Sequence, residues 1–69
     1  MHIAVMEITA ETIKTARLKL GETQAAFASR FGVNQSTVHH WETKGPPDEG
    51  TALVALQFVL SGLSIGSAA

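Results

Sequence analysis

The chain has 69 residues, no cysteine and a formal net charge of -1, and 45% of its residues are hydrophobic. This length supports one domain, and the lack of cysteine excludes disulfides and cysteine-bound zinc as sources of stability. The apolar content argues against disorder, and no stretch is long enough to span a membrane as a helix. The N-terminus lacks the basic region of a secretory signal, so we expect a cytoplasmic protein.

The first half of the chain is predicted to form two helices. Residues 1–7 are predicted to form an N-terminal arm or a short strand. The first helix begins at Thr9, a residue type that caps helix N-termini, and Gly21 ends it in a left-handed conformation. The second helix begins at Thr23 and runs to Phe31, where the next glycine stops it.

The third and fourth helices are separated by two consecutive prolines, which cannot continue a helix. Asn34 is predicted to cap the third helix, which covers residues 35–43. Asp48 is predicted to cap the fourth, over residues 48–61. This last helix is apolar on nearly every side, so it is either buried all round or covered by a partner. Residues 62–69 are small and are predicted to form a flexible tail.

The pattern in the middle of the chain is typical of a helix-turn-helix unit, two short helices joined by a tight turn. Ala28 is small enough for the two helices to cross closely. Gly32 adopts the positive φ that the turn needs. Val38 and Trp41 supply the apolar inner side of the second of these helices. The sequence therefore predicts an all-α fold in which residues 8–61 form one domain around this unit.

This region resembles the Cro/C1-type (XRE-like) family of helix-turn-helix DNA-binding domains. The resemblance is carried by residues 16–28 and 31–42, above all by a Thr-Gln pair and by a Gly-Val-x-x-x-Thr-Val-x-x-Trp-Glu pattern. It implies a compact, lambda-repressor-like bundle of four to five helices. It also implies a homodimeric transcription regulator, in most cases a repressor, that acts on the DNA of a bacterial or phage-infected cell and is therefore nucleoid-associated.

The outer face of the third helix is predicted to read DNA. Since Val38 and Trp41 point inward, steps of ~100° per residue leave an outer face with no apolar side chain. This face consists of Gln35, Ser36, His39, His40 and Thr43. Gln35 can form two hydrogen bonds with the N6 and N7 atoms of adenine. The resemblance implies that Gln35, Ser36 and His39 are the base-reading residues.

A second group of side chains is expected to contact the DNA backbone. This group comprises Thr23, Gln24, His40, Thr43 and Lys44. Thr23 and Gln24 match the usual phosphate contacts of the family, at a helix N-terminus whose free N–H groups also attract anions. The remaining cations that shape a modest positive surface are Lys14, Lys19 and Arg30. Such a surface predicts weak non-specific binding and reliance on dimerisation and on base contacts.

Simpler interpretations exist for several of these residues. Gln35 and Ser36 are also ordinary residues for the first turn of a helix. His39 and His40 point ~100° apart and lack a third ligand, so we expect no metal. Ser36 and His40 share helical spacing but lack an orienting acid and an oxyanion hole, so we expect no enzyme and no cofactor. Trp41 points inward, which favours core packing over base stacking.

Two opposite charges are predicted to meet inside the fold. Arg17 lies between Ile13 and Leu20 on the buried side of the first helix, and Glu42 lies one turn beyond Val38 on the third. A lone buried charge is very costly, so Arg17 and Glu42 should form an ion pair. The family has an Arg–Glu pair at the matching positions. The alternative is that each side chain reaches water separately.

The leading functional hypothesis is a sequence-specific regulator that binds a pseudo-palindromic double-stranded DNA operator as a homodimer. The competing hypothesis is a protein-interaction module on the same fold, for example an antitoxin-like or accessory subunit, whose partner binds residues 48–61 or the outer face of the third helix. The near-neutral charge and the apolar fourth helix support the second hypothesis, and two departures from the family weaken parts of the first. The segment after the reading helix has one base and two acids, and too few residues follow Leu60 for a full fifth helix.

Overall fold

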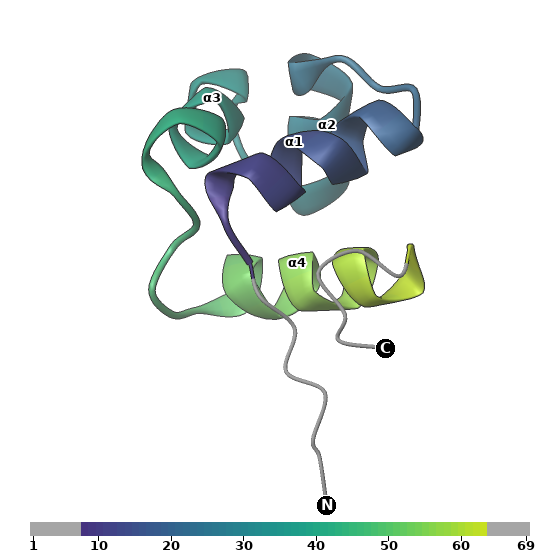
Figure 1. Ribbon diagram of the computed structural model, residues 1–69. Helices are drawn as coiled ribbons and strands as arrows, with labels where there is room; N and C mark the ends of the chain where they lie inside the picture. Colours follow the sequence, from purple (N-terminus) through teal and green to yellow (C-terminus); the bar gives the residue numbers. More distant parts are fainter. Residues whose placement is uncertain (1–7, 64–69) are drawn as a thin grey trace, which may run out of the picture.

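The computed structural model describes residues 8–63, and within this range the regular secondary structure consists of four α-helices joined by short connections, without strands (Figure 1). The all-α prediction is therefore confirmed. The arm predicted for residues 1–7 and most of the predicted tail, residues 64–69, lie outside the described residues. The four helices are α1 (Ala10–Lys19), α2 (Gln24–Phe31), α3 (Gln35–Lys44) and α4 (Thr51–Gly62).

The predicted helix starts follow from local hydrogen bonds. The Thr9 hydroxyl accepts from the backbone N–H of Thr12 at 3.1 Å, and the Thr12 hydroxyl accepts from the N–H of Thr9 at 2.8 Å. The Thr23 hydroxyl likewise accepts from the N–H of Ala26 at 3.1 Å. These caps satisfy N–H groups that have no partner within the helix. Asn34 occupies the N-cap position of α3, but its side chain makes no capping hydrogen bond.

The connection between α2 and α3 depends on one glycine. Gly32 has φ 67° and ψ 31°, a left-handed conformation that strains residues with a Cβ atom. The next N–H, of Val33, donates to the carbonyl of Ala28 at 3.0 Å, a pattern typical of a helix that ends at glycine. The predicted positive φ at Gly32 is therefore confirmed, and α3 begins only a few residues after α2 ends.

The hydrophobic core receives side chains from all four helices. Trp41 is 4% exposed and its ring meets that of Phe31 edge-on at 5.7 Å, so it is a core residue and presents no face to a nucleotide base. Leu20, predicted to be buried, is only partly so. The buried residues are Ile13, Ala16, Phe27, Ala28, Val38, Trp41, Leu56 and Leu60.

The start of α4 differs from the prediction. Asp48 does not cap this helix, which begins at Thr51 after Gly50 and extends to Gly62. The segment between α3 and α4 first carries the chain along the outside of the bundle, so that α4 packs mainly against α1 (Figure 1). Helical backbone over residues 48–50 would shorten that connection, because a helix rises only ~1.5 Å per residue.

One side of α4 is buried and the opposite side is open. Leu56 and Leu60 are fully buried, whereas Val54 is 51% exposed and Phe58 is 77% exposed. The helix contains no charged residue. The prediction that this helix is buried all round is therefore wrong for a single chain. The alternative, that a partner covers it, stays a prediction. Among the helices of residues 8–63, none combines the length and the apolarity that crossing a lipid bilayer requires.

Candidate nucleic-acid interface

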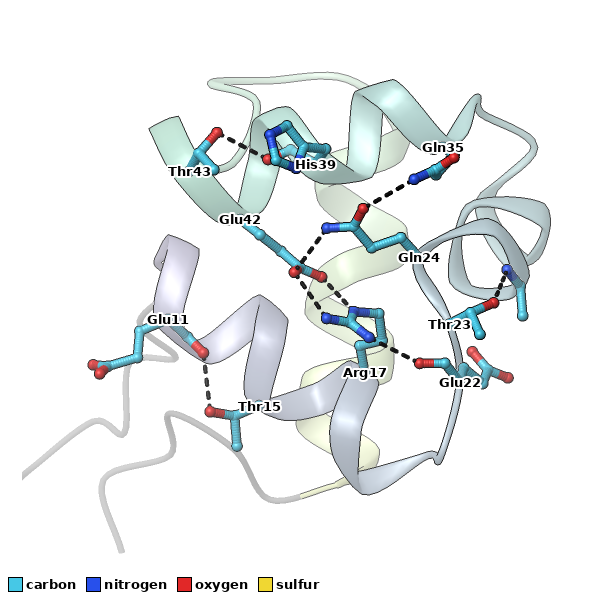
Figure 2. Close-up of polar contacts among 11 residues, drawn as sticks. Glu11, Thr15, Arg17, Glu22, Thr23, Gln24, Gln35, His39, Glu42 and Thr43 are labelled. Atoms are coloured by element: carbon cyan, nitrogen blue, oxygen red, sulfur yellow. Dashed lines mark hydrogen bonds and ion pairs between the residues drawn. The ribbon is translucent and has the colours of Figure 1, made fainter.

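The predicted ion pair joins α1 to α3. The Nε of Arg17 lies 2.7 Å from Oε2 of Glu42, and Nη2 lies 3.1 Å from Oε1 (Figure 2). The two side chains are 13% and 4% exposed, so they do not reach water separately. A third N–H of the guanidinium donates to the backbone carbonyl of Glu22 at 3.0 Å. Such two-pronged contacts between arginine and a carboxylate are strong charge-assisted hydrogen bonds with a defined geometry.

The environment of Glu42 keeps its carboxyl group ionised. Burial raises the pKa of this group, but hydrogen bonds from Arg17 and Gln24 lower it, and the charges of Arg17 and Lys14 lower it further. The net effect holds the pKa of Glu42 below its usual range. The same contact raises the pKa of Arg17. Glu42 is therefore a carboxylate at neutral pH, and both its oxygens act only as hydrogen-bond acceptors.

A chain of hydrogen bonds leads from this ion pair to the surface of α3. The Nε2 of Gln24 donates to Oε1 of Glu42 at 3.2 Å, and the Nε2 of Gln35 donates to Oε1 of Gln24 at 3.2 Å. Figure 2 shows Gln24 between Glu42 and Gln35. Both glutamines are the first residues of their helices. Both glutamines were expected to contact DNA, but their contact with each other was not predicted, because it depends on how α2 and α3 pack together.

The predicted DNA-reading face of α3 is solvent-exposed, as its helical spacing required. Gln35 and His39 lie one turn apart on α3 (Figure 2). Exposure leaves these side chains available, and their contact with bases stays a prediction. The exposed residues of this face are Gln35, Ser36, His39, His40 and Thr43.

The side chains expected to contact the DNA backbone differ in whether their polar groups already have partners within the protein. The hydroxyls of Thr23 and Thr43 both serve their own helices, the first as an N-cap acceptor and the second as a donor to the carbonyl of His39 at 2.9 Å. Gln24 is half-buried, and both ends of its amide are occupied by side chains. Lys44 is exposed at the C-terminal end of α3. Of these four, Lys44 offers a positive charge to a phosphate.

The positive surface is smaller than the sequence suggested. Arg30 donates from its Nε to Oε1 of Glu22 at 3.3 Å and forms an ion pair through Nη2. The hydrogen bond from Arg30 lowers the pKa of Glu22, so this carboxylate is also ionised at neutral pH. Arg30 is therefore not the available cation that the sequence predicted. Its charge is instead balanced by Glu22, eight positions earlier in the chain and outside the helical spacing that identifies such pairs.

Comparisons with known proteins give no match. No family model matches the chain, and neither does any curated protein or solved structure. Within residues 8–63, no group of His, Cys, Asp or Glu side chains is arranged to hold a metal ion. The polar face of α3 and the hydrogen bonds that lead to it are therefore the features that bear on function.

We expect the stability of the protein to fall as the pH drops below the ordinary glutamate range. A carboxyl group whose pKa is lowered by folding contributes stability above its unfolded pKa, and this contribution is lost as the pH falls through the folded value. The pKa of Glu42 is lowered in this way. Melting temperatures measured by circular dichroism between about pH 6 and about pH 3 should show the decrease. In Glu42→Gln the decrease should be smaller, and an equal decrease in both proteins would contradict the prediction.

Proposed function

We propose that this protein is a sequence-specific, double-stranded DNA-binding transcription regulator of the helix-turn-helix class, and that it acts as a repressor. The observation that carries the proposal is the exposed polar face of α3, whose first side chain is held in place from α2. In helix-turn-helix proteins the second helix of the unit enters the major groove with its N-terminal part. Here that part begins with Gln35 and Ser36, and His39 follows one turn later.

The residues around this face have distinct roles in the proposal. Gln35, Ser36 and His39 read base edges, because they lie on the exposed side of the first turns of α3. His40 and Lys44 lie farther along the same helix, where they meet phosphates. Thr23 and Thr43 complete the contacts to the DNA backbone, together with the free N–H groups at the start of α2, whereas the amide of Gln24 is engaged by Glu42 and Gln35.

Replacing Gln35 by alanine should weaken binding to the preferred DNA sequence by about 1–3 kcal/mol. The loss should be confined to one base pair of the site, because a side chain that reads a base discriminates only there. Affinities for a set of duplexes, each altered at one position, test this. Thr15→Ala, at an exposed position of α1 outside the proposed interfaces, is the matched control. If Gln35→Ala weakened binding equally for all sequences, Gln35 would be a backbone contact.

The proposed regulator is a homodimer on a pseudo-palindromic operator. The exposed Val54 and Phe58 lie one turn apart on α4, on the side away from the buried Leu56 and Leu60. Because α4 has no charged residue, a second copy of the same face meets no charge repulsion there. Two-fold symmetry would then place the two α3 helices about one turn of DNA (~34 Å) apart.

A second candidate function is a protein-interaction module, such as an antitoxin-like or accessory subunit, that uses α4. Phe58, which is 77% exposed, favours this alternative, because a large exposed aromatic side chain is typical of a binding surface. The formal net charge of -1 also gives no general attraction to nucleic acid.

Selection of duplexes from a random DNA pool by the purified protein tests the proposal. A palindromic consensus is the expected result, since it requires both base reading and two-fold symmetry. Affinity for that consensus should decrease steeply between about 50 and about 200 mM salt, because phosphate contacts release counterions. Failure to enrich any sequence would contradict the DNA-binding proposal. Capture of a protein partner with little salt dependence, abolished by a change at Phe58, would favour the module.

A further inference from the structure

We propose that the Glu42 carboxylate makes this protein prefer adenine over guanine at the base that Gln35 reads, although Glu42 itself touches no base. It does so by fixing the orientation of the two amide groups between itself and the surface. This inference rests on the proposed function, because it assumes that Gln35 meets a base edge. The evident role of Glu42, in its ion pair with Arg17, is structural. The inference gives Glu42 a second role, because it positions the groups that determine base specificity.

The Glu42 carboxylate determines which group donates in each hydrogen bond of this chain. An ionised carboxylate can only accept, so Gln24 must turn its NH₂ group toward Oε1 of Glu42, 3.2 Å away. The carbonyl oxygen of Gln24 then faces the other way, toward Gln35. Because that oxygen also only accepts, Gln35 must present its own NH₂ group to it, again at 3.2 Å.

The opposite direction is disfavoured by the ion pair. If the Gln24 amide turned over, its oxygen would face the Glu42 oxygen and two acceptors would meet without a proton between them. The carboxylate cannot rotate away to relieve this contact, because both of its oxygens accept from Arg17, at 2.7 and 3.1 Å. Glu42 is also only 4% exposed, so water does not replace the lost partner readily.

The orientation of Gln35 decides what it can offer to DNA. One hydrogen of its NH₂ group is used by Gln24, which leaves one N–H donor and the carbonyl oxygen as an acceptor. Adenine presents an acceptor, N7, beside a donor, the N6 amino group, and so matches both. Guanine presents two acceptors, N7 and O6. The held amide therefore makes two hydrogen bonds with adenine, whereas with guanine it makes one and places two oxygens against each other.

The test uses Gln24→Met. The methionine side chain has a similar length but no amide group, so it cannot fix the orientation of Gln35. Gln35→Ala first identifies the base pair that Gln35 reads. Affinities of the full-length protein are then measured for the selected operator with adenine or guanine at that position. The unaltered protein should prefer adenine, and Gln24→Met should lose about five-fold of that preference, roughly the contribution of one hydrogen bond. Gln57→Met, outside the chain of hydrogen bonds, should retain the full ratio.

A second variant tests the origin of the effect. In Glu42→Gln an amide replaces the carboxylate and can present either an oxygen or an NH₂ group to Gln24, so the adenine-to-guanine ratio should again fall. A merely structural role for Glu42 would instead weaken binding to both duplexes equally and leave the ratio unchanged. Melting curves establish whether this variant is folded. If it is not, Gln24→Met decides, because Gln24 is not a member of the ion pair.

The possible outcomes separate this inference from the proposed function. An unchanged ratio in Gln24→Met, or a guanine preference in the unaltered protein, would overturn the inference and leave sequence-specific DNA binding in place. The absence of any sequence preference in the unaltered protein would overturn the proposed function and the inference with it. A lowered ratio in Gln24→Met and in folded Glu42→Gln, with the ratio of Gln57→Met unchanged, is the expected result.

Discussion

Replacing Arg17 by methionine is expected to lower the free energy of unfolding by about 3 kcal/mol. Methionine fills much of the same space but leaves the Glu42 carboxylate, which is 4% exposed, without its cationic partner. Removal of one member of a buried pair costs far more than the pair contributes over an apolar replacement, because the remaining charge is still desolvated. For a chain of 69 residues such a loss is a large part of the total stability.

Lys19→Met provides the matched control for this prediction. Lys19 lies on the same helix as Arg17 and is exposed, so its loss should change stability by no more than about 0.5 kcal/mol. Urea unfolding curves, recorded at one protein concentration for all variants, measure both effects. Equal stabilities of the two variants would show that the Arg17–Glu42 contact contributes nothing beyond ordinary surface interactions.

Replacing Phe58 by aspartate is expected to weaken self-association at least about 100-fold, which corresponds to about 3 kcal/mol. Phe58 is 77% exposed, so a single folded chain loses little packing when it is changed. In the proposed dimer the same position lies within an apolar interface, where an unpaired carboxylate is strongly unfavourable. Binding to a palindromic operator should weaken as well, because only the dimer contacts both half-sites simultaneously.

The control for this second prediction places the same charge elsewhere. Leu18, on α1, is 60% exposed, and Leu18→Asp should leave the dimerisation constant close to that of the unaltered protein. Sedimentation equilibrium gives the constants, and melting curves show whether each variant is folded. A monomer at all concentrations for the unaltered chain would contradict the homodimer and strengthen the case for a different protein partner on α4.

The two predictions concern different parts of the energetics of this small domain. The Arg17–Glu42 pair links α1 to α3 within one chain, and its loss should be independent of protein concentration. The Phe58 face contributes nothing to the core of the single chain, so its effect should depend on concentration. Measuring both variants at several concentrations therefore separates the stability of the fold from the stability of the proposed assembly.

The sequence by itself determined most of what depends on short-range interactions. Thr9 and Thr23 cap their helices through groups three residues away, and Gly32 ends α2 because its own φ is left-handed. These features are readable because all the atoms involved lie within a few positions of the chain. The Arg17–Glu42 pair was also predictable, although its members are far apart in sequence. Each charge lies on the apolar side of a helix, where only an opposite charge is a suitable partner.

Only the tertiary structure decided the features that depend on how helices pack. The contact between Gln24 and Gln35 follows from the packing of α2 and α3, and helical periodicity contains no information about it. The start of α4 at Thr51 and the outward position of Phe58 depend in the same way on where α4 meets α1. An apolar helix such as α4 has no polar side to indicate which face is buried. Its orientation is therefore determined by the shape of the rest of the core.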